Sequence, residues 1–114
     1  MVQESTPVKP VKDIDQRHVT KGGGIIRVET WIDRKTDEIT SYNLAYVNTG
    51  ICAVDNGRVL GFDDAHLYPG FPTRHHEHHF GEVVHNDTYQ GFDDLLDRFQ
   101  AELGALKKVY GKRY

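Results

Sequence analysis

Residues 25–33 read IIRVETWID, and this stretch decides the fold because apolar and polar side chains alternate along it. In an extended chain, Ile26 and Val28 would point to one side, and Arg27 and Glu29 would point to the other. A period of two residues is typical of a β-strand that is buried on one face. The segment is therefore predicted to be a strand in a sheet with one covered side.

The same alternation recurs further along the chain. Residues 38–48 place Tyr42 and Leu44 on one face, so they predict a second strand that forms a hairpin with the first. The sequence DNG at 55–57 indicates a turn, because Asn-Gly tolerates the positive φ that tight turns require. The four predicted strands cover residues 25–33, 38–48, 58–63 and 75–85.

The C-terminal part of the chain has the spacing of an amphipathic helix. Acidic residues at 93 and 94 and lysines at 107 and 108 match the polarity of a helix dipole. The apolar stripe consists of Phe92, Leu95, Leu96, Phe99, Leu103 and Leu106. The predicted fold class is α+β: an antiparallel four-stranded meander with this C-terminal helix packed on one face.

Length and composition bound the domain organisation. The chain has 114 residues, enough for one modest core, and its 14 Lys+Arg against 17 Asp+Glu exclude a strongly basic nucleic-acid coat. Residues 1–20 are predicted to be a flexible arm and residues 21–114 a single domain. No apolar run approaches the roughly 20 residues of a membrane helix, and a single cysteine fits a reducing compartment, so we expect a cytoplasmic protein.

Four histidines fall within five residues in the segment RHHEHHFGE, 74–82. If this segment is extended, His76 and His78 share one face, and His75 and His79 share the other. Such a group of imidazoles can be a solvated surface, a metal site or an acid–base centre. The spacing alone does not choose between the last two.

The metal alternative rests on the His-x-His pair. His76 and His78 offer two nitrogen ligands on one strand face, and Glu82 is the candidate third ligand. Imidazole and carboxylate ligands suit Zn²⁺ or Ni²⁺. In this alternative the segment forms a binding or interaction module without catalysis.

The acid–base alternative needs no cofactor. His76 and His78 would exchange protons with a phosphodiester, and His75 or His79 would orient them. Asp63 would hold one ring in its tautomer. The substrate-binding candidates are Arg58, Arg74 and His66, the two arginines as ligands for a phosphate.

The sequence resembles the TumE-type toxins of bacterial toxin–antitoxin modules. The resemblance rests on YNLAYV at 42–47, GRVLGFDD at 57–64, HHEH at 75–78 with Gly81, and Tyr89-x-x-Phe92 before the helix. It extends over roughly residues 25–103. The chain departs from the family pattern by an insertion at 48–56, a longer loop at 67–74, Phe62 in place of tyrosine and Asp64 in place of asparagine.

This resemblance implies a growth-inhibiting toxin whose partner is a cognate antitoxin, a helix-turn-helix DNA-binding protein. A homodimer is compatible with it. The histidines, Asp63 and the arginines then favour the hypothesis that the toxin is a metal-independent ribonuclease acting on RNA.

Overall fold

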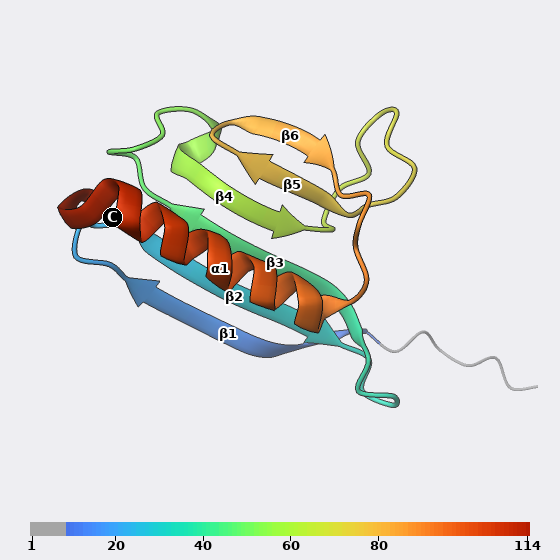
Figure 1. The fold of residues 1–114 in the computed structure, drawn as a ribbon. Coiled ribbons are helices and arrows are strands. Elements are labelled where there is room, and N and C mark those ends of the chain that lie inside the picture. Colours follow the sequence, from blue (N-terminus) through green and yellow to red (C-terminus); the bar gives the residue numbers. More distant parts are fainter. Residues whose placement is uncertain (1–8) are drawn as a thin grey trace, which may run out of the picture.

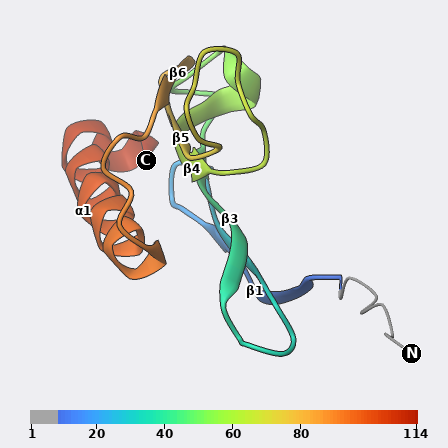
Figure 2. The ribbon, with the colours of Figure 1, turned by 90° about the vertical axis from the view of Figure 1, so that its right-hand side faces the viewer.

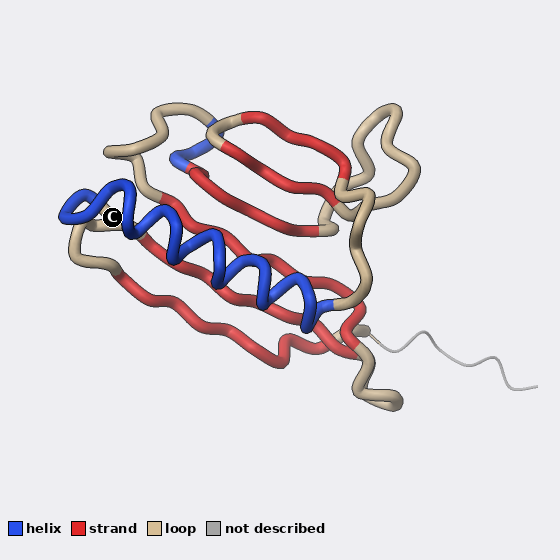
Figure 3. The backbone as a smooth tube through the Cα atoms, viewed as in Figure 1, coloured by secondary structure: helices blue, strands red, loops and turns tan. Residues whose placement is uncertain are grey.

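Six antiparallel strands, hydrogen-bonded in chain order, form the sheet of the computed structural model, which describes residues 9–114 (Figure 1). A single long helix, α1 (Phe92–Tyr110), lies across one face (Figure 3). The strands are β1 (Val11–Val19), β2 (Ile25–Ile32), β3 (Ile39–Val47), β4 (Arg58–Asp63), β5 (His76–His79) and β6 (Glu82–His85). Short 3₁₀ turns, η1 (Asp55–Gly57) and η2 (Gly111–Arg113), precede β4 and follow α1.

The predicted α+β class, antiparallel pairing and C-terminal helix are confirmed, but the prediction of four strands is wrong. One additional strand, β1, lies in the predicted arm and pairs with β2 from Val11↔Ile32 to Val19↔Ile25. As an edge strand it is mostly exposed, so backbone pairing defines it more than an apolar pattern does. The part of the predicted arm at residues 1–8 lies outside the described residues.

The other additional strand comes from the segment 75–85, which divides into β5 and β6. Phe80 and Gly81 both have positive φ, 48° and 90°, and together make a two-residue hairpin turn between the strands. Turns of this kind usually contain Asn-Gly or Asp-Gly, because a side chain at positive φ is unfavourable. Phe-Gly gives a weaker signal, so the sequence pattern does not reveal this turn.

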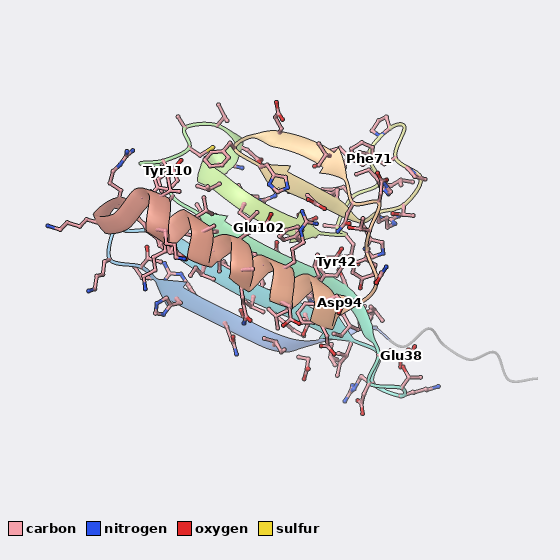
Figure 4. The ribbon with its side chains drawn as sticks, viewed as in Figure 1. Glu38, Tyr42, Phe71, Asp94, Glu102 and Tyr110 are labelled. Atoms are coloured by element: carbon pink, nitrogen blue, oxygen red, sulfur yellow. The ribbon has the colours of Figure 1, made fainter. Side chains whose placement is uncertain are left out.

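The core lies between α1 and the central strands. Leu44 and Tyr46 of β3 and Phe62 of β4 are fully or almost fully buried, and Phe99 of α1 meets Phe62 edge-on with ring centroids 6.1 Å apart. Figure 4 shows the labelled Tyr42 in the layer between β3 and the first turns of α1, where it contacts Phe92. The predicted helix therefore packs through the predicted stripe.

The opposite face of the sheet carries no helix, as the side view of Figure 2 shows for the described residues. The strand side chains that point away from α1, onto this open face, are mainly polar. Asn43, Asp63 and His76 lie in register across β3, β4 and β5. The candidate functional residues gather here, at the end of β4 and along β5.

Candidate active site

The antiparallel register places one carboxylate beside two imidazoles. Asp63 of β4 pairs with His76, and His78 lies two residues further along β5, on the same face. Nε2 of His76 is 2.9 Å from Oδ1 of Asp63, and Nε2 of His78 is 3.3 Å from Oδ2. The three residues are 1%, 3% and 6% exposed for His76, His78 and Asp63, so this is a buried polar cluster.

The partners of His78 determine which of its nitrogens carries the proton. Nη1 of Arg58 lies 2.8 Å from Nε2, and a guanidinium can only donate, so Nε2 accepts. Nδ1 therefore bears the proton and donates it to Oδ2 of Asp55 at 2.8 Å. In this arrangement the Nε2 lone pair of His78 accepts from Arg58, while Nε2 lies 3.3 Å from Oδ2 of Asp63.

Gly61 allows Arg58 to reach this histidine. A Cβ at Gly61 would lie 2.7 Å from Cδ of Arg58 and 3.4 Å from Cβ of His78. The arginine side chain therefore crosses over the glycine on the open face of β4. A larger residue at 61 would displace Arg58 from the cluster.

His76 is oriented by the backbone. Its Nδ1 lies 2.9 Å from the carbonyl oxygen of Arg74, which can only accept, so Nδ1 carries a proton. Nε2 is fully buried and makes no well-directed hydrogen bond, although Asp63 is close to it. A neutral His76 of this tautomer would point its Nε2 lone pair toward the carboxylate of Asp63. Because the two would repel each other, the arrangement requires a proton or another cation between them.

The electrostatics of the cluster reflect this proximity. Burial opposes ionisation of Asp63, but the adjacent His76 ring and the backbone N–H of Ala65 hold its pKa below the usual range. Burial also opposes a charged His76, yet the neighbouring Asp63 and the carbonyl of Arg74 raise its pKa above the ordinary value. Asp63 is thus an anion beside the imidazole of His76, which is readily protonated.

The cluster lies against a cavity of about 610 Å³ on the open face of the sheet. Its other walls include Trp31, Asn43, His66 and Tyr68. The ring of Tyr68, on the loop between β4 and β5, packs edge-on against His76 with centroids 4.7 Å apart. The cavity is large enough for a nucleotide-sized ligand and combines aromatic walls with an ionisable floor.

Two of the clustered histidines lie on the other side of the sheet. His75 is predicted to belong to the catalytic group, but it contacts Tyr42 through Nδ1 at 2.7 Å and stacks on Tyr89 at 3.7 Å. His79 bonds to Glu77 at 2.8 Å beneath α1. Burial lowers the pKa of His75, which fits a neutral ring that belongs to the packing of the helix face.

The remaining candidates are dispersed. His66 lines the cavity, and Arg58 contacts His78. Arg74 contributes its backbone carbonyl, while its side chain is exposed and does not line the cavity. Glu82, the candidate third metal ligand, is exposed on β6 opposite His79, so it does not belong to the cluster, and Asp63 takes that position.

Two residues that contribute to the site are not predicted from the sequence. Asp55 is part of the turn signal DNG, and its carboxylate reaches His78 because the β4–β5 hairpin returns the end of β5 to the start of β4. Asp55 and Asn56 both have positive φ, 51° and 55°, an unfavourable backbone that places this carboxylate at the site. Tyr68 lies in a loop without a periodic pattern, and no sequence signal indicates its contact with His76.

The chain is similar to a known protein family. The family model described as "Toxin TumE" matches residues 5–107, nearly the whole chain. The chain belongs to the TumE toxin family. Members are toxins of toxin–antitoxin modules, which implies a cognate antitoxin as partner. No curated protein and no solved structure matches the chain.

The departures from the TumE pattern have clear positions in the structure. Phe62 faces α1 in the core, where a phenol hydroxyl is not needed. Asp64 accepts hydrogen bonds from Oγ of Ser41 at 2.6 Å and from the backbone N–H of Tyr42 at 3.1 Å. Within the described residues, no helix combines the length and the apolar composition that crossing a bilayer requires.

Proposed function

We propose that this TumE-family protein is an RNA-cleaving toxin that uses His76 and His78 as a metal-independent acid–base pair. The observation that supports the proposal best is the convergence of both Nε2 atoms on Asp63 beside a cavity of about 610 Å³. Their opposite ring nitrogens are occupied by Asp55 and by the Arg74 carbonyl, so both rings present Nε2 to the same place.

The roles follow from the hydrogen-bond directions. His78 keeps the Nε2 lone pair, so it takes the proton of a ribose 2′-hydroxyl while the 2′-oxygen attacks the adjacent phosphorus. His76, protonated on Nε2, gives that proton to the 5′-oxygen as the phosphorus–oxygen bond breaks. The products are a 2′,3′-cyclic phosphate and a 5′-hydroxyl. Each positioned group contributes roughly 10²–10⁴-fold to the rate.

Arg58 supplies the charge that a phosphodiester requires. Its guanidinium lies 2.8 Å from His78 and 3.6 Å from Asp63, next to the reacting groups, and can bind phosphate in a forked manner. A phosphate that attracts Arg58 also releases Nε2 of His78 for its role as a base. Because His76 is buried under Tyr68, the substrate reaches it once that side chain moves aside.

The partner in this proposal is an antitoxin of the helix-turn-helix, DNA-binding kind, as the toxin–antitoxin arrangement implies. A homodimer is compatible with this proposal. An RNA substrate places the action of the protein in the cytoplasm.

The test is induced expression of the intact chain in bacteria, together with incubation of purified protein and RNA in EDTA. We expect growth arrest and RNA fragments that end in 2′,3′-cyclic phosphate. The double variant His76→Gln, His78→Gln should no longer arrest growth. Its rate of RNA cleavage should fall by at least about 10²-fold, because each group contributes at least that much.

The matched control is His79→Gln, which removes an imidazole from the same strand on the other face of the sheet. It should remain toxic. Unaffected growth with the intact chain, or cleavage that survives in the double variant, would contradict the proposal.

A further inference from the structure

We propose that Asp63, His76 and His78 form a binding site for one divalent transition-metal ion, of the Zn²⁺ or Co²⁺ type. This goes beyond the proposed acid–base chemistry, and the binding itself does not depend on it. The three residues each present one ligand atom, and these atoms lie within 4.8 Å of one another.

The two distances to Asp63 are close to those between ligands of one metal ion, and all three ligand atoms lie within 4.8 Å of one another. Tetrahedral ligands at the usual bond lengths of 2.0–2.2 Å from zinc lie about 3.3–3.6 Å apart. Nε2 of His76 and Nε2 of His78 are already 2.9 and 3.3 Å from the two oxygens of Asp63. An ion therefore requires only small side-chain adjustments at these contacts.

The direction of the His76 ring gives a second, independent argument. In a hydrogen bond, the oxygen lies along the N–H direction; between two ligands of one metal, both lone pairs point to a common third point. Nε2 of His76 is buried, is 2.9 Å from Asp63, and has no well-directed hydrogen bond. A buried nitrogen without a well-directed partner, beside a carboxylate, can be satisfied by a metal ion as well as by a proton.

The surroundings of the rings are also those of metal ligands. A ligating histidine almost always donates its other N–H to a carbonyl or a carboxylate, which fixes the ring and strengthens the ligand. Nδ1 of His76 donates to the Arg74 carbonyl at 2.9 Å, and Nδ1 of His78 donates to Asp55 at 2.8 Å. Two nitrogens and one carboxylate oxygen suit Zn²⁺, Co²⁺ or Ni²⁺ better than Mg²⁺ or Ca²⁺.

Arg58 is the competitor of the ion. Its Nη1 lies 2.8 Å from Nε2 of His78, so a metal and this guanidinium cannot use that lone pair together. Arg58 is only partly buried and borders the cavity, so its side chain can swing outward. Removal of its charge should therefore tighten binding, whereas removal of an ordinary structural arginine would weaken it.

The metal site has a consequence that rests on the proposed function. An ion that occupies both Nε2 atoms prevents His78 from taking a proton and His76 from giving one. Stoichiometric Zn²⁺ should then inhibit RNA cleavage, and EDTA should restore it. Zn²⁺-dependent cleavage would instead support the metal site and overturn the metal-independent mechanism.

The experiment is calorimetric titration of EDTA-treated, dialysed protein with Zn²⁺, together with the visible absorption of the Co²⁺ form. We expect one ion per chain and Co²⁺ bands of a low-coordinate site. Asp63→Asn and His76→Gln should weaken Zn²⁺ binding by more than about 100-fold, and Asp55→Asn by about 10–100-fold. Arg58→Gln should strengthen it by about tenfold, as expected when a competing charge is removed.

The control is His79→Gln, whose Zn²⁺ affinity should stay within about twofold of that of the parent protein, since this ring lies on the other face. Circular dichroism of each variant reports whether the fold is retained. No Zn²⁺ binding by the parent protein overturns the proposal without recourse to any variant. So does equal affinity in the folded Asp63→Asn variant.

Discussion

Arg98 of α1 and Glu77 of β5 form a bidentate ion pair, with Nη1–Oε2 at 2.6 Å and Nη2–Oε1 at 2.7 Å. Glu77 is buried and lies between His76 and His78 in sequence, with its side chain on the opposite face. The pair therefore fastens the helix to the strand that bears the candidate site.

Replacement of Arg98 by methionine should destabilise the fold. The variant leaves a buried carboxylate without its two charge-assisted hydrogen bonds, and such a loss costs about 1–3 kcal/mol. Urea unfolding measures the change in the free energy of unfolding. Arg17→Met, on the exposed edge strand, serves as the control and should stay within about 0.5 kcal/mol of the parent. Equal stability of the two variants would show that the pair contributes little.

The same pair predicts a dependence of stability on pH. Burial opposes ionisation of Glu77, but Arg98 and His79 hold its pKa below the ordinary value of 4.5. A lowered folded-state pKa adds stability that is present above the unfolded-state pKa and is lost as the pH falls through the lower value. Urea unfolding between pH 6 and pH 3 should therefore show a steeper fall for the parent protein than for Glu77→Gln. Parallel curves for the two proteins would exclude this carboxylate as the source.

Two glycines should respond to alanine in opposite directions. Gly81 has a φ of 90°, and a Cβ there would lie 2.3 Å from Cγ2 of Val54, so Gly81→Ala should cost about 1–2 kcal/mol. Gly104 is in the middle of α1, and a Cβ there would have open space for 4 Å around it, so Gly104→Ala should add about 0.8–1 kcal/mol. Thermal unfolding distinguishes the two, and a gain at both positions would refute the strained-turn explanation.

Gly61→Ala tests the position of Arg58 without removing its charge. The new methyl group would meet Cδ of Arg58 at 2.7 Å and push the guanidinium away from His78. Under the proposed mechanism, RNA cleavage should fall by about tenfold or more, as expected when a positioned group is displaced by about an ångström. Fragment yield over time measures the rate, with circular dichroism as a check of the fold. Full cleavage activity in a folded Gly61→Ala protein would exclude the proposed role of Arg58.

Much of the fold follows from local periodicity. The alternation in residues 25–33 and the stripe from Phe92 to Leu106 predict their elements because each pattern reflects one buried face. β1 has no such face, since it lies at the sheet edge and is defined by its pairing with β2. The turn at Phe80–Gly81 depends on two positive φ angles, and the dipeptide Phe-Gly does not indicate them in the sequence.

The candidate site is predictable to the extent that it follows strand alternation. The shared face of His76 and His78, and the separation of His75 and His79 from them, follow directly from the two-residue period. The contact of Asp55 with His78 does not, because it depends on a left-handed turn and on the register of the β4–β5 hairpin. Glu82 lies outside the cluster for a related reason, since an unforeseen turn separates it from β5.

Every charged or imidazole group of the cluster comes from residues 55–78, one hairpin with its preceding turn and its connecting loop. The chemistry is thus contributed by one continuous segment, in which contacts between residues 20 and 23 positions apart bring the groups together. We expect this hairpin to form before the pairing of β1 with the sheet and the docking of α1, because the entropy cost of closing a loop rises with sequence separation. A substitution in the edge strand β1, which supplies none of these groups, should therefore leave their mutual placement unchanged.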